Sequence, residues 1–488
     1  MLHNIKRLTR HSAVYGVGHI VSRSLNFLLL PIHANIFLPE EYRTPALLFS
    51  SLAILNVVFS YGMDVAFLRF FILADSDEEK RRIFSTAFWM ILSTGVCFMG
   101  AMLLFPAPFS KIIFRSAQYI TLVRLGAGIL LADALTLIPF LVLRGEEKST
   151  LFMLLKTLQI AINLALNIVL VVIMRVGIQG IFIANLVASV MTLGALTPII
   201  ARWLRPRFRK DTLGELLRFG IPYLPSGLAF IVMDQIGRFF LDRMAGEEAA
   251  GIFSANCKLA IFMNLIVAAF RFAWHPFFLS TSKQDDAPLI FARVLTYFLI
   301  VTGFFFLVIS FFIEEIVHFQ LFGISLMRLE YVEGIKIVPV VMLAYLMLGV
   351  YTNFVVGIYL KKKTVYIPFA TGTGALVSVV VNILLIPSMG IMGAAWATFI
   401  SYVVMALVLY LVTRRLYPIP YEIGRITKIL IVFGGVFFLY THIFMGEAAI
   451  YRVLLLASLF PLLWVFRFYV PDEISAVRKL LRGREGNG

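Results

Sequence analysis

Long apolar stretches constrain this chain more than any other feature, because roughly 20 consecutive apolar residues are what a helix needs to cross a lipid bilayer. Such stretches recur along nearly all of the 488 residues. Hydrophobic residues make up 60% of the chain and charged residues only 14%, which is well below the balance of a soluble domain. Because backbone polar groups must be satisfied within the bilayer, we predict an all-α polytopic membrane protein.

Apolar runs bounded by charges, proline or glycine predict about fourteen transmembrane helices. The first six lie near residues 11–36, 42–72, 83–105, 119–143, 151–174 and 177–203. The next six lie near residues 214–241, 248–275, 288–313, 334–360, 364–387 and 391–413. The last two lie near residues 426–444 and 449–469.

Lysine and arginine gather in alternate loops, and this predicts the orientation because positive loops stay in the cytoplasm. The basic loops include "EEKRR" at 78–82, "RGEEK" at 144–148 and "RWLRPRFRK" at 202–210. Both termini fall on the same side, so we expect both in the cytoplasm. The net charge of +16 is divided among these short clusters, which favours topology signals over a nucleic-acid-binding surface.

An internal repeat predicts two related halves. "FLPEEYRTPALLFS" at 37–50 resembles "MAGEEAAGIFS" at 244–254, and "GIQG" at 177–180 matches "GIMG" at 390–393. The matched segments are about 210 residues apart, as in transporters built from duplicated halves. We therefore expect two pseudo-symmetric six-helix lobes around a central cavity, followed by two additional helices and a basic cytoplasmic tail. The expected boundaries are 1–210, 211–415 and 416–488.

Arg23 is the clearest charged residue inside a predicted span. It lies roughly 18 Å into its helix at about 1.5 Å per residue, too deep to reach either surface easily. A charge at the bilayer centre costs about 2.5–3.5 kcal/mol on insertion scales, so such residues usually face a bundle interior. We expect Arg23 to bind an anion in the central cavity, and a structural ion pair within the first half is the alternative.

Further charged residues in the predicted spans are candidates for the same cavity. The candidate substrate-binding residues are Arg23, Arg124, Arg238 and Arg271, and the candidate gating or ion-coupling residues are Asp64, Asp133 and Asp234. The planar fork of arginine suits phosphate, so the predicted cargo carries phosphate. The acids have two open interpretations, namely binding of a coupling H⁺ or Na⁺ and closure of the empty cavity by pairing with arginine. A local ion pair is an alternative for Asp234 and Arg238, which are one helical turn apart.

Motifs for metal or nucleotide chemistry are absent from the sequence. The histidines show no H-E-x-x-H spacing, "GTG" at 372–374 lacks the third glycine of a dinucleotide loop, and no G-x-x-x-x-G-K-[ST] loop occurs. Cys97 and Cys257 lie in apolar stretches without metal-ligand spacing. We predict no catalytic residue, no metal site and no cofactor beyond a coupling H⁺ or Na⁺.

Several segments together resemble the bacterial polysaccharide biosynthesis proteins. They include "SRSLNFLLLP" in the first predicted helix, "YGMDVAFLRFF" at 61–71, "IVPVVMLAYLMLGVYTNF" and "VNILLIPSMGIMGAAWAT". The resemblance covers nearly the full chain. These proteins are the oligosaccharide-lipid (O-antigen type) flippases of the multidrug/oligosaccharidyl-lipid/polysaccharide exporter superfamily.

The resemblance implies a transporter, not an enzyme, in the cytoplasmic (inner) membrane. Its implied function is to move a polyprenyl-pyrophosphate-linked oligosaccharide between leaflets by alternating access, for a cell-surface polysaccharide such as the O-antigen of lipopolysaccharide. The implied partners are this lipid-linked oligosaccharide, membrane lipids, a polysaccharide polymerase and glycosyltransferases, with no nucleic acid.

Alternatives remain within and outside this fold. The lipid II flippase typically has an Arg-Asp pair in helix 1, whereas "SRSLNF" has the arginine without the aspartate. Multidrug and toxin exporters tend to carry acids in their cavities. An integral-membrane envelope enzyme, such as an O-antigen ligase or polymerase, would form bonds, and a scaffold for glycosyltransferases would tolerate loss of the cavity arginines.

Overall fold

The protein is a multi-pass membrane protein of helices. The computed structural model describes residues 25, 27–321, 324–446 and 448–470. Twelve helical segments within these residues are long and apolar enough to cross a membrane, and a shorter apolar helix, α19 (Ala449–Val465), follows them. The predicted all-α fold is confirmed. Most of the predicted first helix, including Arg23, lies outside the described residues.

The first predicted half contains eight described α-helices. They are α2 (Leu29–Ile36), α3 (Pro39–Ser60), α4 (Met63–Leu73), α5 (Asp77–Leu104), α6 (Pro106–Phe114), α7 (Ile120–Gly145), α8 (Ser149–Asn167) and α9 (Ile178–Trp203). A π-helical turn, η1 (Ile168–Ile173), continues α8 to the end of its span. These bounds follow the predicted spans closely, because spans end where charges, proline or glycine interrupt the apolar runs.

The second predicted half contains α10 to α17. The helices are α10 (Lys210–Gly220), α11 (Leu224–Met244), α12 (Glu247–Leu259), α13 (Ile261–Thr281), α14 (Ala287–His318), α15 (Val338–Leu360), α16 (Tyr366–Met389) and α17 (Ile391–Leu416). Two 3₁₀ segments, η2 (Ile221–Tyr223) and η3 (Leu329–Ile337), precede α11 and α15. Two short antiparallel strands, β1 (Gln320–Leu321) and β2 (Ile324–Ser325), form a hairpin after α14.

The chain divides into two compact units. The first unit combines Met1–Phe277 with Val317–Leu416, and the second combines Phe278–Ile316 with Tyr417–Gly488. The first unit therefore holds helices from both predicted halves, and every site described below lies within it.

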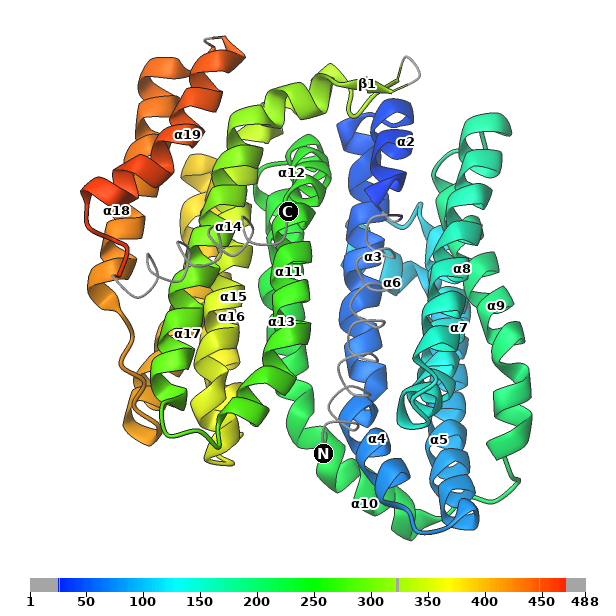
Figure 1. The fold of residues 1–488 in the computed structure, drawn as a ribbon. Helices are drawn as coiled ribbons and strands as arrows, with labels where there is room; N and C mark the ends of the chain where they lie inside the picture. The colour runs from blue at the N-terminus through cyan, green and yellow to red at the C-terminus, as the bar shows by residue number, and fades with distance from the viewer. Residues whose placement is uncertain (1–24, 26, 322–323, 447, 471–488) are drawn as a thin grey trace, which may run out of the picture. The chain divides into compact units, whose positions relative to one another are not determined.

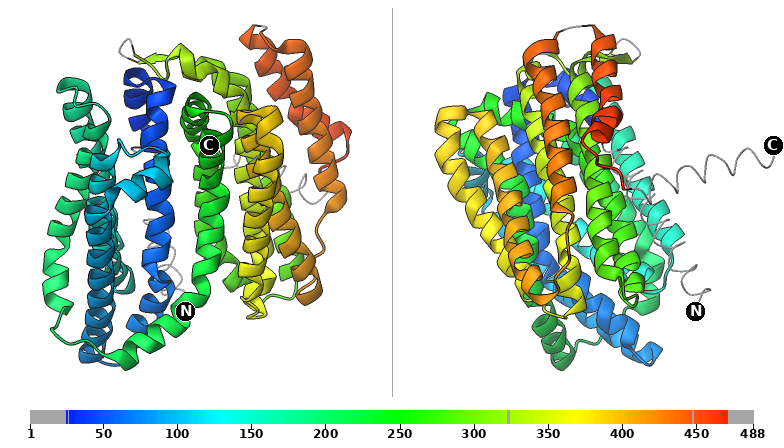
Figure 2. Two further views of the ribbon diagram at one scale, coloured as in Figure 1. Left: turned by 180° about the vertical axis from the view of Figure 1, so that it is seen from behind. Right: turned by 60° about the vertical axis from the view of Figure 1, so that its left-hand side comes forward.

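Two predicted spans are each interrupted where the chain turns sharply. Tyr61 and Gly62 both have positive φ, 49° and 70°, and they separate α3 from α4. The 3₁₀ turn η2 separates α10 from α11 and contains Pro222, which cannot donate a backbone hydrogen bond. The two interruptions meet, because a side chain at Gly62 would overlap the backbone of Gly220. Accordingly, α10 lies beside α4 (Figures 1 and 2).

The first unit has separate hydrophobic cores for its two halves. One group of buried residues joins α4, α5 and α7 and includes Trp203 of α9 and Leu216 of α10. Another group joins α11, α15, α16 and α17 around Met233 and Met405. Except for Leu216 of α10, the buried residues of each group therefore lie within one predicted half.

The second unit is built from nearly all of α14 with α18 (Ile423–Leu439), the π-helical turn η4 (Tyr440–Phe444) and α19. Arg452 of α19 pairs with Glu315 and donates to the carbonyl oxygen of Phe311 at 3.1 Å. The ring of Phe433 packs closely against Gly303. The two C-terminal helices, α18 and α19, are thus fixed to α14 by packing and by charge, respectively.

Candidate functional site

A polar pocket lies between helices of the two halves in the first unit, and we call it the central pocket. Its volume is about 340 Å³, and residues of α2, α3, α8, α9, α11 and α12 line it. Two of these residues carry a positive charge, Arg238 on α11 and Lys258 on α12. None of the described lining residues is an aspartate or a glutamate. The central pocket is therefore cationic.

Amide side chains form part of the wall of the central pocket that belongs to the first half. Asn163 and Asn167 of α8 and Asn185 of α9 line it. Asn167 donates to Asn163 Oδ1 at 3.0 Å, and His33 of α2 donates through Nε2 to Asn167 Oδ1 at 2.8 Å. Amides both donate and accept hydrogen bonds, so this wall suits a ligand with many hydroxyl or phosphate oxygens.

Gln235 joins the two halves beside the central pocket. Its Oε1 accepts from Ser50 Oγ of α3 at 2.7 Å and from Arg238 Nη1 at 2.6 Å. Its Nε2 donates to Asp234 Oδ2 at 2.5 Å, and Tyr345 of α15 donates to the other oxygen of Asp234 at 3.1 Å. Gln235 therefore stands between the two charges of α11.

Neutral oxygens hold Arg238. Besides Gln235, its Nη1 donates to the backbone oxygen of Asp234 at 2.8 Å. Within the residues that the structure describes, no ion pair joins Arg238 to the Asp234 carboxylate, so the local pair considered from their spacing is replaced by this arrangement. The ammonium of Lys258 lies 5.3 Å from the centre of the Tyr42 ring, within range of a cation–π interaction.

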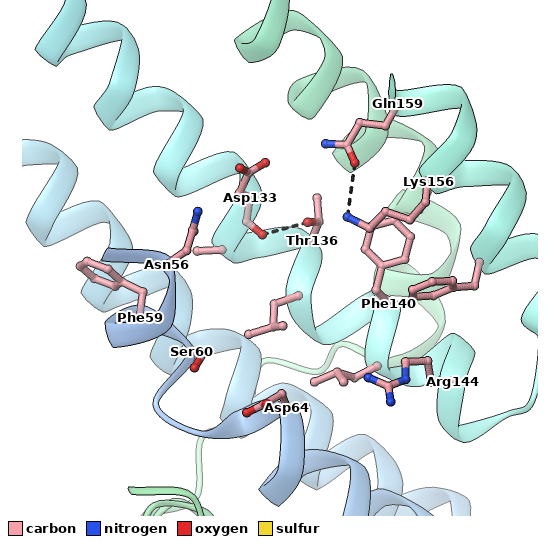
Figure 3. A pocket seen from close by; sticks show the side chains of 14 residues that line it. Asn56, Phe59, Ser60, Asp64, Asp133, Thr136, Phe140, Arg144, Lys156 and Gln159 are labelled. Carbon is pink, nitrogen blue, oxygen red and sulfur yellow. Dashed lines mark hydrogen bonds between the residues drawn. The ribbon is translucent and has the colours of Figure 1, made fainter. Parts of the chain in front are cut away.

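A second pocket, of about 370 Å³, lies within the first half between α3, α4, α7 and α8. Its charged lining residues are Asp64, Asp133, Arg144 and Lys156. Figure 3 shows Asp64 and Arg144 at one end of this second pocket and Asp133, Lys156 and Gln159 toward the other. Cations and acids thus share this pocket, in contrast to the central one.

A buried cluster of charges, which we call the Arg43 clasp, joins the halves near the start of α3. Arg43 pairs with Asp242 at the end of α11 and with Glu247 at the start of α12. It also donates to the carbonyl oxygen of Phe114 at 3.0 Å. The side chains of Arg43 and Asp242 are each 3% exposed, whereas that of Glu247 is 58% exposed. The clasp holds the two halves together at this end of the bundle.

The structure places the predicted residues in different surroundings. Arg238 lines the central pocket, Asp234 lies beside it, and Asp64 and Asp133 line the second pocket. Arg124 on α7 and Arg271 on α13 have exposed side chains and line neither pocket. Arg23 lies outside the described residues. The functional roles of all seven residues stay predictions.

Sequence reasoning missed Lys258 and the polar face of α8. Lys156, Gln159, Asn163 and Asn167 recur at helical spacing along α8, so they share one face of an otherwise apolar helix. That periodicity was a usable signal. Lys258 lies inside a predicted span and was detectable by the same rule that singled out the arginines.

Comparison with known proteins relates the chain to one family. The sequence profile of the family described as "Polysaccharide biosynthesis protein" matches residues 8–282, which is more than half of the chain. A comparison with curated proteins gives no match.

Solved structures of a flippase and of transporters resemble this chain in fold. A structure titled "Lipid II flippase MurJ, inward closed conformation" is 13% identical, with a TM-score of 0.71 over 93% of this chain and 98% of that chain. A "MATE in the straight conformation" is 17% identical, with a TM-score of 0.60 over 84% of this chain and 95% of that chain.

A third structure is described as that of a MOP superfamily transporter from Pyrococcus furiosus. Its title states that "reverse polarity of binding pocket suggests different function". It is 16% identical, with a TM-score of 0.59 over 84% of this chain and 95% of that chain. At these identities the three likenesses establish the fold alone.

Proposed function

Because the chain belongs to the family of polysaccharide biosynthesis proteins, we propose that it is a flippase that moves a polyprenyl-pyrophosphate-linked oligosaccharide across the cytoplasmic membrane. Transport proceeds by alternating access of the central pocket to the two sides. The cargo serves a cell-surface polysaccharide, the O-antigen being the predicted example. Both termini lie in the cytoplasm in this proposal, because the basic loops and the termini share one side.

The cationic central pocket is the observation that supports this cargo best. Arg238 and Lys258 supply two positive charges without an acidic lining residue. A pyrophosphate carries the complementary charge, and each charge-assisted hydrogen bond contributes about 1.5–3 kcal/mol. The amides of α8 and α9 offer donors and acceptors for sugar hydroxyls next to these cations.

The same observation weighs against the multidrug or toxin alternative. An organic cation would need acidic groups in the pocket, whereas Asp234, next to the lining residue Gln235, is engaged by Gln235 and Tyr345. A lipid II exporter shares the pyrophosphate, so the sugar part of the cargo must separate that alternative by experiment. A ligase or polymerase would change the covalent structure of the cargo, and a scaffold would not depend on the pocket cations.

The decisive experiment uses the purified protein in liposomes that contain a labelled polyprenyl-pyrophosphate oligosaccharide. The fraction of label in each leaflet is measured for wild type, Arg238→Gln and Lys258→Met. Arg175→Gln is the matched control, because Arg175 is exposed and lines neither pocket. Loss of one charge-assisted contact of about 1.5–3 kcal/mol predicts roughly ten- to hundredfold weaker apparent affinity in the pocket variants. The control should behave as wild type.

Three results would contradict the proposal. Equal transport by all variants would remove the cationic pocket from the mechanism. Covalent change of the cargo would favour an enzyme. Preference for lipid II over other pyrophosphate-linked glycans would favour the lipid II exporter.

A further inference from the structure

The second pocket, in the first half, is separate from the central pocket and holds an acid and a base at the depth of the membrane. Asp133 lies in the middle of α7, and Lys156 lies two turns into α8. An ionisable residue inside a membrane span is costly unless it serves a function or has a partner. Here both residues are partly buried, and no ion pair joins them in the part of the chain that the structure describes.

A chain of hydrogen bonds through two neutral side chains connects the two charges. Lys156 Nζ donates to Gln159 Oε1 at 3.3 Å, and Gln159 Nε2 donates to Ser189 Oγ of α9 at 3.3 Å. Ser189 Oγ in turn donates to Asp133 Oδ1 at 2.7 Å. The ammonium also lies 4.2 Å from the centre of the Phe140 ring. The acid and the base therefore form one network across α7, α8 and α9.

The chemistry of this network favours a proton over a metal cation as its ligand. A metal cation in this pocket would need several oxygen ligands, but Gln159 Oε1 already accepts from Lys156, and the ammonium would repel a second cation. Within the residues that the structure describes, no group of three or more His, Cys, Asp or Glu could hold a metal ion. A proton needs one carboxylate oxygen only.

We propose that Asp133 is a proton-binding site through which the flippase is coupled to a proton gradient. In the step, a hydronium ion transfers its proton to a carboxylate oxygen of Asp133: an O–H bond of hydronium breaks, an O–H bond to Asp133 forms, and the products are water and a neutral carboxylic acid. The pair of Asp133 and Lys156 then passes from zero net charge to +1. Release of the proton to water reverses the step.

The pocket supplies a path for this proton from one end of the bundle. Arg144 lies in the last turn of α7, and Asp133 lies eleven residues earlier, about 16 Å away at about 1.5 Å per residue. Asp64 of α4 and Arg144 are the other charged groups that face the pocket (Figure 3). In the orientation predicted from the basic loops, this end opens to the cytoplasm.

Two helices connect the proton site to the central pocket. On α8, Gln159 is one turn from Asn163, which lines the central pocket. On α9, Ser189 is one turn from Asn185, which lines it as well. A change of charge at Asp133 weakens the charge-assisted bond from Ser189 and so acts on the two helices that carry the amide wall. This coupling rests on the proposed function.

The test separates proton binding from transport. The protonated carboxyl of Asp133 should give an infrared C=O band that appears as the pH is lowered, in protein without cargo. Asp133→Asn should lack this band, Asp133→Glu should move it to the frequency of a glutamic acid, and the exposed-loop control Asp75→Asn should leave it unchanged. If the band is unaffected in both Asp133 variants, the site is wrong, whatever the transport result.

The transport arm uses liposomes at zero membrane potential. For one proton per cargo, a gradient of one pH unit should change the steady-state leaflet ratio of the labelled lipid about tenfold. Asp133→Asn should equilibrate the leaflets without responding to the gradient, and Asp133→Glu should retain a response.

Other outcomes of the transport experiment would overturn the coupling role, the choice of ion or the proposed function. A gradient response in Asp133→Asn equal to wild type overturns the coupling role, and transport driven by a Na⁺ gradient overturns the choice of ion. If wild type moves no lipid with or without a gradient, the proposed function fails, while the infrared result still decides whether Asp133 binds a proton.

Discussion

Removing the Arg43 side chain should open the bundle at the end where the clasp joins the halves. In Arg43→Ala, Asp242 keeps its buried position but loses the partner that neutralises it. In the open state the same carboxylate would be in water. The substitution therefore raises the free energy of the closed state more than that of the open state.

The size of the effect follows from the burial of the partners. Breaking a buried ion pair by removing one partner costs about 3–5 kcal/mol, and the side chains of Arg43 and Asp242 are each 3% exposed. Glu247 is 58% exposed, so its pair with Arg43 adds about 1 kcal/mol or less. Arg43→Ala should shift the closed-to-open ratio by roughly 10²- to 10⁴-fold and Glu247→Gln by about fivefold or less.

The assay measures access to the central pocket from the side of the clasp. Ser254→Cys places a thiol on the pocket lining, in a background in which Cys97 and Cys257 are replaced by alanine. The rate of modification by a membrane-impermeant maleimide should rise strongly in Arg43→Ala. Arg243→Ala, which removes an exposed arginine next to Asp242, should leave the rate unchanged.

A charge-exchange variant distinguishes loss of the clasp from a folding defect. Arg43→Asp combined with Asp242→Arg restores an opposite pair and should return the modification rate toward that of wild type. A folded Arg43→Ala protein with the wild-type rate would refute the reasoning, and so would a larger effect from Glu247→Gln than from Arg43→Ala.

Three further predictions concern other parts of the first unit. Gly62→Ala should lower thermal stability in detergent well beyond the effect of Gly100→Ala, because Gly62 has positive φ and a close backbone neighbour whereas Gly100 has open space around it; equal stability would contradict this. Asn167→Leu should cost about 1–3 kcal/mol of stability because His33 loses its acceptor, and an unchanged unfolding midpoint would exclude that bond. Arg23→Ala, at matched expression in a strain that lacks the native copy, should trap lipid-linked oligosaccharide in the cytoplasmic leaflet, and normal translocation would leave Arg23 a structural role.

The helices were predictable because the bilayer imposes a minimum length of apolar residues on every span. The run at 119–143, for example, became α7 (Ile120–Gly145) almost unchanged. The breaks inside two spans were harder to predict. Tyr61-Gly62 carries a local glycine signal, but its meaning depends on Gly220, which comes from a different helix and meets it only in the folded chain.

The candidate residues illustrate the same limit. The rule that a deep charge marks an interior identified Arg238, and it equally identified Arg124, whose side chain is exposed. Depth in a span does not give the direction in which a side chain points, because that depends on the neighbours of each helix. Arg43 is not among the predicted site residues, because its partners Asp242 and Glu247 are some 200 residues away in the sequence.

The position of Asp242 on α11 links the clasp to the cargo. Asp242 and Arg238 are one helical turn apart, so the helix that ends in the clasp also carries a cation of the central pocket.

If opening the clasp moves α11, cargo must bind the closed and open states with different affinities, and linkage makes the coupling reciprocal. The cargo Kd of wild type held closed, divided by the cargo Kd of Arg43→Ala held open, should then give the coupling factor. Saturating cargo should change the closed-to-open ratio of wild type, measured by modification of Ser254→Cys, by that same factor. Unequal factors would show that the clasp and the central pocket do not share a two-state motion of α11.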